Sequence, residues 1–305
     1  MGYTPVIKMA DSNLEWSPTP ATKLNIPATL LSGQCFRWRI TSSNHWAGVT
    51  GDTVIRLVPA REGFWWQTYP VNGKWDLVSR YFALDVDLDA LFQQWIAADP
   101  RIAQATRRFS GLRILRQEID EVIFSFLCAS CNTITKITRS IQSLEKRAGE
   151  PIAQIEGTLF YKFPRAEAIS ALTEQGLRAD LWGYRAPRLL QIAGEISSLG
   201  PGWFDWLRGL NYREAHAALM EFFGIGAKIA DCICVFGLGH EEAVPVDTHV
   251  RRKAVELYEP DLKGKSLTPG NYAAIAEAVR SRFGGYAGWA QQYLFFDDLK
   301  TSLNV

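Results

Sequence analysis

The chain has 305 residues, of which 47% are hydrophobic and 21% charged, and 33 basic side chains oppose 32 acidic ones for a formal charge of +1. Its 11 Trp, 10 Tyr and 16 Phe residues supply apolar area for a packed core, which excludes a disordered chain. The near-neutral total does not indicate a polyanion partner, but basic residues gathered on one face would still allow one. The length predicts about two domains.

No run of about 18 apolar residues occurs, and the first residues, MGYTPVIKMADSNLEW, match neither a signal peptide nor a transit peptide. We therefore expect an intracellular protein without membrane association. The odd number of cysteines argues for reduced thiols at Cys35, Cys128, Cys131, Cys232 and Cys234. Cys128 and Cys131 have the C-x-x-C spacing of a zinc site, but no second pair shares it, so a zinc site is not supported.

The first third of the chain is predicted to form antiparallel β-structure. Segments rich in aromatic and β-branched residues, separated by Ser, Asn, Gly and Asp, cover residues 34–40, 45–50, 53–59 and 64–70. In the first of these, Phe36, Trp38 and Ile40 alternate with polar neighbours, as in a strand with one buried face. Apolar residues then recur at helical spacing over 77–96, which predicts helices packed against the sheet.

From about Gln117 to its end the chain is predicted to be helical. Apolar periodicity indicates helices near 119–127 and 134–144, and further helices over 187–198, 212–223, 228–237, 248–258, 271–283 and 288–299. We therefore predict an α+β fold with two domains. An antiparallel β-rich N-terminal domain with flanking helices (residues 1–116) packs on an all-helical domain (residues 117–305).

The segment from Tyr212 to Leu257 carries the most chemical information. An apolar-periodic helix stops at the sequence Gly224-Ile225-Gly226, and another begins at once. Two glycines one residue apart let the backbone turn sharply and approach a ligand, and the amides that open the second helix suit a phosphate. This is a helix-hairpin-helix signature, which grips a DNA backbone. The alternative is a tight turn between two helices without a ligand.

Two charged residues follow the hairpin at positions that suit covalent chemistry. Lys228 lies in the first turn of the second helix, where the helix dipole disfavours another positive charge and so favours the free amine of a nucleophile. Asp247, in VPVDTH (244–249), is placed to cap the next helix. An amine facing a carboxylate there can displace a base from deoxyribose and form a Schiff base. The alternatives are a surface lysine and an aspartate that only caps.

The hairpin, Lys228 and the V-P-V-D-x-H string resemble the helix-hairpin-helix family of DNA glycosylases. More narrowly, seven blocks in order over nearly the whole chain are similar to 8-oxoguanine DNA glycosylases: SGQCFRW (32–38), RYFALDVDL (80–88), GLRILRQ (111–117), FSFLCASCNTITKIT (124–138), GYRA (183–186), AKIADCIC (227–234) and GGYAGWAQ (284–291). No cysteine follows Cys234, which disfavours the iron–sulfur branch of the superfamily.

The resemblance implies a bifunctional DNA glycosylase/AP lyase of base excision repair that flips 8-oxoguanine out of duplex DNA, preferably opposite cytosine. Lys228 would attack C1′ and form a Schiff base, after which β-elimination nicks the strand. Asp247 would stabilise the oxocarbenium-like transition state. The amides around Gly224, Gly226 and Ile229 would hold phosphates together with His249.

The resemblance also implies a pocket for the flipped base. The Gly33 carbonyl would accept a hydrogen bond from the N7–H that 8-oxoguanine has and guanine lacks. Phe295 and Cys232 would sandwich the base, and Gln291 would bond its Watson–Crick edge. Without the resemblance, Phe295 is equally well explained as a core aromatic, Cys232 as a small buried hydrophobic residue and Gly33 as a turn glycine.

The residues expected at the opposite base depart from the family pattern. Tyr184 would wedge into the vacated space and Arg185 would contact the orphaned cytosine, unless Tyr184 is only a packed loop aromatic. Three asparagines are usual where this chain has Cys131 and Asn132 followed by threonine, and Lys136 replaces a cytosine-reading arginine. A thiol cannot make the amide's hydrogen bonds, and lysine lacks the bidentate fork of arginine. We expect cytosine selectivity to suffer more than catalysis.

The remaining expectations concern partners and location. The resemblance implies no cofactor, damaged double-stranded DNA as the partner, a monomer, and a nuclear location with mitochondria as a second compartment. It implies a cation on hairpin carbonyls near Glu221, Phe223 and Gly226, where Phe223 replaces the usual proline. Two alternatives stay open: a glycosylase for alkylated bases, which would lack Lys228 or the Gly33 block, and a catalytically silent DNA-binding module.

Overall fold

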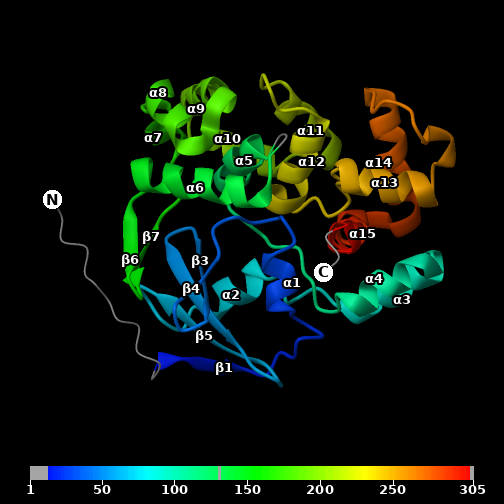
Figure 1. Cartoon of the computed structure of the whole chain (residues 1–305), viewed down its shortest axis with the longest axis horizontal. Coiled ribbons are helices and arrows are strands. Elements are labelled where there is room, and N and C mark those ends of the chain that lie inside the picture. The colour runs from blue at the N-terminus through cyan, green and yellow to red at the C-terminus, as the bar shows by residue number, and fades with distance from the viewer. Residues whose placement is uncertain (1–12, 130–131, 303–305) are drawn as a thin grey trace.

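The computed structural model describes residues 13–129 and 132–302. Its N-terminal part contains a five-stranded antiparallel sheet of order β1-β5-β4-β3-β2, with helices above and beside it (Figure 1). The strands are β1 (Glu15–Ser17), β2 (Arg39–Ile40), β3 (Trp46–Thr50), β4 (Thr53–Pro59) and β5 (Phe64–Tyr69). The predicted α+β fold is confirmed.

Two helices cover one face of this sheet. They are α1 (Ile26–Leu30) and α2 (Trp75–Tyr81). Leu57 of β4 lies between Trp46 of β3 and Trp66 of β5 in the sheet, and these three side chains share a core with residues of both helices. The expectation that the helix after the sheet packs against it is confirmed for α2.

The prediction of a half-exposed strand over residues 34–40 is wrong for most of that range. Only Arg39 and Ile40 pair with β3, and Ile40 on the expected buried face is 56% exposed. The whole stretch 34–38 is buried, including the polar Gln34 and Arg37. This segment runs through the interior, because the polar side chains find buried partners there.

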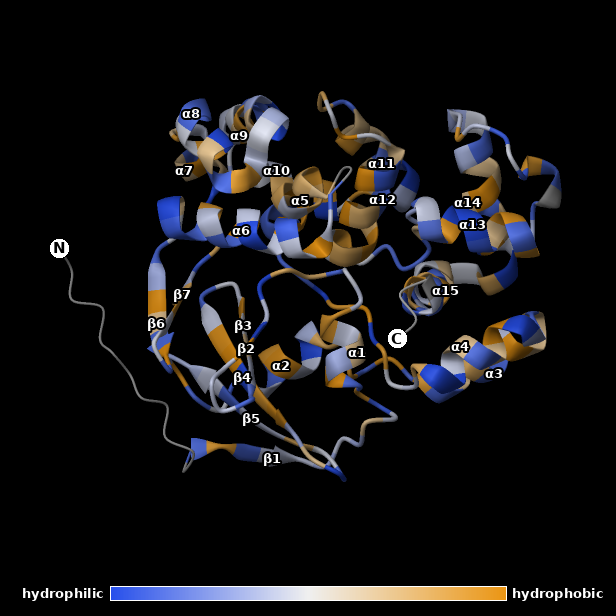
Figure 2. Ribbon diagram, viewed as in Figure 1, coloured by the Kyte–Doolittle hydropathy of each residue, from blue (hydrophilic) through white to orange (hydrophobic). Residues whose placement is uncertain are grey.

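The helical part is built around α5 (Ile119–Cys128), which is mostly hydrophobic in Figure 2 and fully buried from Val122 onward. The other helices are α3 (Leu88–Ala98), α4 (Ala103–Arg108), α6 (Ile134–Ala148), α7 (Ala166–Ser170), α8 (Glu174–Leu177), α9 (Ala186–Leu199), α10 (Gly202–Arg208), α11 (Tyr212–Met220), α12 (Ala227–Ile233), α13 (Thr248–Leu257), α14 (Pro269–Phe283) and α15 (Ala287–Ser302). Short 3-10 turns cover Pro100–Ile102, Gly183–Arg185, Pro260–Leu262 and Gly284–Tyr286, and wider π-helical turns cover Arg178–Trp182 and Cys234–Leu238.

Helix α3 was expected to pack on the sheet, but it and α4 lie elsewhere. They lie against α14 and α15, beside the red helix of Figure 1. Trp95 of α3 is fully buried and contacts the rings of Phe283 and Tyr293 at 6.4 and 5.8 Å between centroids. The apolar face of α3 is therefore completed by the end of the chain.

A β-hairpin interrupts the region that was expected to be helical throughout. Its strands are β6 (Pro151–Ile155) and β7 (Thr158–Tyr161). Glu156 and Gly157 between them have φ of 48° and 82°, as a two-residue hairpin turn requires. Ile155 and Phe160 of this hairpin pack against Val49 of β3, so the hairpin extends the sheet core.

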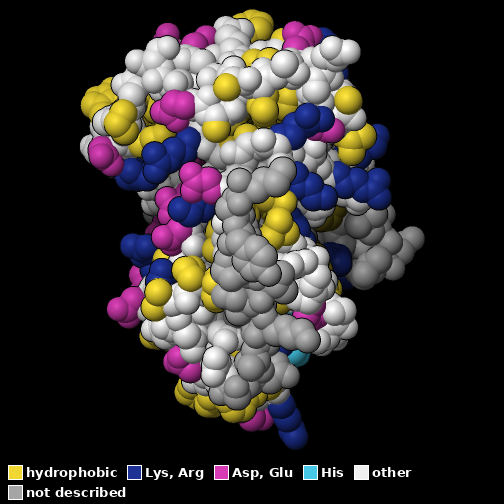
Figure 3. Space-filling view, turned by 90° about the vertical axis from the view of Figure 1, so that its left-hand side faces the viewer, with side chains coloured by type: hydrophobic (Ala, Val, Ile, Leu, Met, Phe, Trp, Pro, Cys, Tyr) yellow, Lys and Arg dark blue, Asp and Glu magenta, His cyan; other side chains and the backbone are white. Residues whose placement is uncertain are grey.

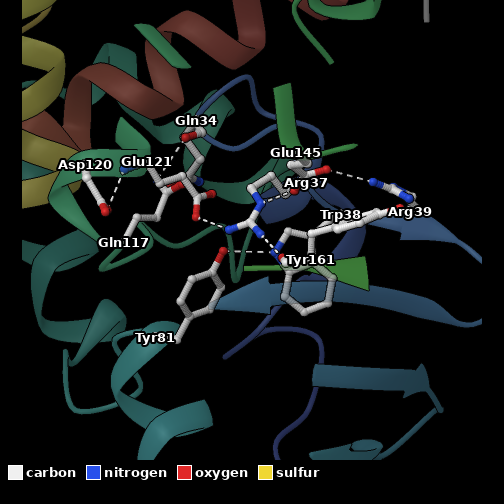
Figure 4. Close-up of polar contacts among 10 residues, drawn as sticks. All are labelled: Gln34, Arg37, Trp38, Arg39, Tyr81, Gln117, Asp120, Glu121, Glu145 and Tyr161. Atoms are coloured by element: carbon white, nitrogen blue, oxygen red, sulfur yellow. Dashed lines mark hydrogen bonds and ion pairs between the residues drawn. The ribbon is translucent and has the colours of Figure 1, made fainter. Parts of the chain in front are cut away.

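A buried ion-pair network joins the sheet-bearing part to the helices (Figure 4). Arg37 is 1% exposed and donates to Glu121 Oε2 at 2.6 Å and to the Tyr161 carbonyl at 2.5 Å, and its Nε pairs with Glu145. Arg39 donates to the second Glu145 oxygen at 2.9 Å. The network links the segment before β2 to α5, α6 and β7.

The surface carries charges of both signs. On the face shown in Figure 3, Lys and Arg side chains gather across the middle of the molecule, with Asp and Glu side chains among them. Among the residues that the structure describes, no helix combines the length and the apolar character of a membrane span.

Candidate active site

Helices α11 and α12 form the predicted hairpin. Asn211 and Glu214 make a capping box at the start of α11. Between the helices, Gly224 adopts a φ of +98°, a left-handed conformation that strains other residues. Gly226 is the N-cap of α12, and the space where a side chain would stand on it is open. The amides of Ala227 and Lys228, which open α12, therefore have no intrahelical partner, as in an anion site.

Lys228 lies half-buried in the first turn of α12. Its Nζ is 5.1 Å from the centroid of the Phe126 ring of α5, which is a cation–π contact. One turn further along α12, Cys232 is 2% exposed. Burial raises the pKa of the Cys232 thiol to about 12, although the neighbouring Lys228 opposes the shift. Cys232 is thus a neutral thiol near pH 7.

Asp247 caps α13, as expected, and accepts a hydrogen bond from the Val250 amide at 2.8 Å. The negative charge of Asp247 raises the pKa of the Cys232 thiol, and the positive charge of Lys228 lowers it. Both charged groups therefore lie near that thiol. The Val246 amide, immediately before Asp247, donates to the Tyr272 hydroxyl of α14 at 3.2 Å. The backbone that carries the carboxylate is therefore held from α14.

Residues from opposite ends of the chain meet in the predicted base pocket. Gly33 has a φ of +76°, and a Cβ placed on it would lie 3.6 Å from the Phe295 ring and 3.6 Å from Ile134 Cδ1. Gln292 Nε2 donates to the Ser32 carbonyl at 2.8 Å, which ties α15 to the Gly33 loop. The structure thus brings Gly33 and Phe295 together, as the predicted pocket requires.

Gln291 of α15 presents an unused polar atom. Its side chain is 3% exposed, and within the described part of the chain its Oε1 has no hydrogen-bond partner. An unpaired buried oxygen is costly, and a ligand that donates a hydrogen bond would remove that cost.

A carboxylate on α15 orients the predicted phosphate ligand His249. His249 Nδ1 is 2.8 Å from Asp298 Oδ2, and Arg252 Nε donates to Asp298 Oδ1 at 3.0 Å. Burial alone would raise the pKa of Asp298, but the hydrogen bonds from Arg252 and His249 hold it below its usual value. The His249 ring also meets Phe295 edge-on at 5.5 Å between centroids. Sequence reasoning missed Asp298 and Arg252.

The residues predicted for the opposite base are only partly brought together. Cys131 lies outside the described residues. Asn132 donates to the Cys128 carbonyl at 3.1 Å and accepts from the Thr133 amide at 3.1 Å, so its amide is used within its own loop. Lys136 is exposed on the first turn of α6.

Tyr184 and Arg185 are stacked on each other before α9. Tyr184 is 61% exposed, and the Arg185 guanidinium carbon lies 4.3 Å from the centroid of its ring. Arg185 is buried, and its positive charge opposes the rise that burial causes in the pKa of Cys128. The Cys128 carbonyl in turn accepts the hydrogen bond from Asn132. An exposed ring backed by a buried cation suits a wedge better than a packed loop aromatic.

The predicted cation site on hairpin carbonyls stays a prediction. The Gly226 carbonyl already accepts the amides of Ile229 and Ala230 at 2.9 and 3.0 Å, and Phe223 is 65% exposed. Over the described ranges, no group of three or more His, Cys, Asp or Glu side chains is arranged to hold a metal. The amide of Ile229, expected to hold a phosphate, is engaged within α12.

A buried carboxylate behind α12 was missed from the sequence. Asp231 is 1% exposed and accepts the hydroxyls of Tyr212 at 2.6 Å and Tyr272 at 2.5 Å. Burial raises the pKa of Asp231. A cavity of about 770 Å³ opens beside it, on a different face of α12 from Lys228 and Cys232. Because Asp231 is fully hydrogen-bonded, we assign this network to positioning α12. A second charged residue, after Lys228, within a short and mostly apolar helix was its one sequence signal.

Comparison with known proteins finds relatives over most of the chain. A family model for the "8-oxoguanine DNA glycosylase, N-terminal domain" matches residues 17–123. The chain is 34% identical to N-glycosylase/DNA lyase OGG1 of Arabidopsis thaliana over 97% of its own length and 84% of that protein. It is also 34% identical to the N-glycosylase/DNA lyase of Saccharomyces cerevisiae, over 72% of this chain and 65% of that one.

Solved structures show the same architecture. The 8-oxoguanine glycosylase/lyase of Clostridium acetobutylicum, in complex with double-stranded DNA containing cytosine opposite 8-oxoG, superposes with a TM-score of 0.82 at 26% identity. The match covers 96% of this chain and 98% of that one. A 3-methyladenine DNA-glycosylase from Archaeoglobus fulgidus, at 22% identity and a TM-score of 0.72, shares the fold.

Proposed function

Because this chain belongs to the 8-oxoguanine DNA glycosylase family and is a DNA glycosylase with lyase activity, we propose that it excises 8-oxoguanine from duplex DNA with Lys228 as the nucleophile. The position of Lys228 carries the proposal. It stands at the start of α12, half-buried beside a neutral Cys232 and near Asp247. Among the lysines of residues 13–129 and 132–302, Lys228 alone combines the hairpin turn with a nearby carboxylate that caps the following helix.

The proposed reaction begins with the free amine of Lys228. Its nitrogen forms a bond to C1′ as the C1′–N9 bond breaks, and the bonding electron pair leaves with the base, which takes up a proton. Positive charge develops on the sugar ring, and Asp247 stabilises it. Loss of a proton and ring opening yield an imine, and removal of a C2′ proton then expels the 3′ phosphate by β-elimination.

Base recognition is proposed to use the pocket around Gly33. The Gly33 carbonyl accepts the N7–H of 8-oxoguanine, whereas guanine would place a lone pair against that oxygen. One buried unsatisfied acceptor costs about 1–3 kcal/mol, or about 5- to 150-fold in discrimination. Phe295 and Cys232 cover the two faces of the base. Gln291 Oε1, which lacks a partner among the described residues, accepts from the Watson–Crick edge.

Selection of the opposite base is proposed to favour cytosine weakly. The exposed Tyr184 ring fills the vacated space, and Arg185 contacts the orphaned base. Asn132 is committed to its own loop, and Lys136 offers one charge without a bidentate fork. Restoring the fork with Lys136→Arg is expected to increase the preference for cytosine about 5- to 150-fold, since a bidentate pair contributes about 1–3 kcal/mol.

Borohydride trapping tests the nucleophile. We expect a covalent protein–DNA complex on a duplex with 8-oxoguanine opposite cytosine, and none with Lys228→Gln. Lys162→Gln is the matched control, because Lys162 pairs with Glu150 at 3.3 Å beside the β6–β7 hairpin. Trapping that persists in Lys228→Gln would assign the chemistry to another amine. Repeating the assay with each of the four opposite bases measures the expected cytosine preference.

A further inference from the structure

A second positive charge sits directly on the hairpin turn. Arg188 lies in the first turn of α9 and is half-buried. A Cβ on Gly224 would stand 2.3 Å from both Cδ and Nε of Arg188, so the arginine occupies the space above this glycine. Any side chain at position 224 would displace it.

An exposed aromatic ring supports the guanidinium. The Arg188 Cζ lies 5.7 Å from the centroid of the Phe223 ring, and Phe223 is 65% exposed at the turn. An exposed cation–π contact of this kind limits the conformations of a long side chain. The guanidinium is thus held at the turn before any ligand arrives, which lowers the entropy cost of binding one.

Arg188 has no anionic partner within residues 13–129 and 132–302. Nearby arginines do: Arg178 pairs with Glu174 at 2.6 Å, and Arg208 pairs with Asp205 at 2.9 Å. Arg188 takes part in no such ion pair. A half-buried, pre-oriented guanidinium without a carboxylate is suited to bind an external anion.

We propose that Arg188 binds a phosphodiester of the duplex as part of the hairpin, beside the amides that open α12. The inference rests on the proposed function, because it needs DNA at the hairpin. Arg188 contributes a charge-assisted hydrogen bond that the backbone amides lack, and Phe223, in place of the usual proline, orients it. The contact is to the backbone and is therefore independent of sequence.

The test measures affinity as a function of salt on a duplex carrying a tetrahydrofuran abasic-site analogue, which has no base to excise. Arg188→Gln is expected to bind about 10-fold more weakly or worse. It should also flatten the slope of log K against log salt by about 0.9, since one phosphate contact is lost. Arg188→Lys keeps the charge and should keep most of the slope. Arg61→Gln is the control, because Arg61 is 95% exposed in the β4–β5 turn.

Phe223→Ala provides an independent arm. It retains the charge but removes the ring, so affinity should fall about two- to fivefold with the salt slope unchanged. An Arg188→Gln variant that matches Arg61→Gln in both affinity and slope would overturn the proposal. If the wild-type protein excises 8-oxoguanine but Arg188→Gln retains the wild-type slope of log K against log salt, this inference alone is refuted. A wild-type protein that does not excise 8-oxoguanine refutes the proposed function instead.

Discussion

Gly33 and Phe295, from the first and last parts of the chain, lie in contact, with 3.6 Å between the ring and the position of a Cβ on the glycine. The glycine is required by its φ of +76°, whereas a Cβ 3.6 Å from the ring would stand at ordinary van der Waals distance. The carbonyl proposed to read N7–H therefore belongs to a peptide whose orientation depends on having no side chain.

Gly33→Ala should impair base recognition more than folding. A left-handed alanine costs about 1–2 kcal/mol, and relief of that strain would rotate the recognising carbonyl. We expect excision of 8-oxoguanine to fall about tenfold or more. Gly157→Ala is matched in backbone conformation, with φ of +82° and no atom within 4 Å of its Cβ position. It should lose similar stability without losing excision. Equal excision rates in the two variants would contradict the role of Gly33.

Tyr272→Phe should weaken catalysis through the backbone of Asp247. The hydroxyl accepts the Val246 amide at 3.2 Å and donates to Asp231 at 2.5 Å, so its removal leaves both buried groups short of a partner. We expect a loss of about 1–3 kcal/mol in unfolding free energy and a slower single-turnover excision.

The control for Tyr272→Phe is Tyr81→Phe. Tyr81 is also buried and accepts the Trp38 indole N–H at 2.9 Å, in the sheet core. It should lose stability while retaining the excision rate. If both variants lose activity equally once corrected for the folded fraction, the positioning role of Tyr272 is wrong.

Arg37→Met should be strongly destabilising and pH-dependent. It leaves Glu121 buried without a cation, which costs about 3–5 kcal/mol. Burial raises the pKa of Glu121 from 4.5 to about 7 even with Arg37 present, and loss of Arg37 raises it further. A carboxyl group whose pKa is higher in the folded than in the unfolded state stabilises the fold at pH values below its unfolded-state pKa. That stability is lost as the pH rises through its folded-state pKa. The deficit relative to wild type should therefore be larger at pH 7.5 than at pH 5.

Urea unfolding at the two pH values checks this. Arg178→Met is the comparison, because Arg178 pairs with Glu174 on the surface, where both side chains are about half exposed. An exposed pair of this kind contributes less than about 1 kcal/mol. A deficit in Arg37→Met that does not depend on pH would show that Glu121 stays charged in the variant.

Stability should decline in alkaline solution because of buried thiols. The four described cysteines are free, and burial raises the pKa of each, with Cys232 at about 12. Above pH 9 the unfolded chain loses thiol protons that the folded chain keeps, so unfolding free energy falls as pH rises, by up to about 1.4 kcal/mol per unit for each thiol. Melting temperatures between pH 8 and 10.5 measure the decline. Cys35→Ala should make it shallower, and an unchanged slope would exclude a contribution from Cys35.

The sequence was sufficient for the elements whose signals are local. Apolar periodicity located α5, α6, α9 and α11 to α15 but missed the short helices α7, α8 and α10, and the glycine pair located the α11–α12 turn. The V-P-V-D string placed Asp247 at a helix start because capping depends on the next three residues. Local signals failed at 34–38 and at β6–β7, where burial is decided by distant partners.

The resemblance placed Gly33 and Phe295 in one pocket, but only the tertiary structure decided how the residues meet. The contact of Gly33 with Phe295, the burial of Arg37 between Glu121 and Glu145, and the placement of Arg188 on Gly224 each join segments far apart in sequence. No periodicity encodes such pairs, because they arise when separate apolar faces close into one core and bring their polar neighbours along. The sequence determined the chemical groups and the local backbone of this site, and packing determined their arrangement.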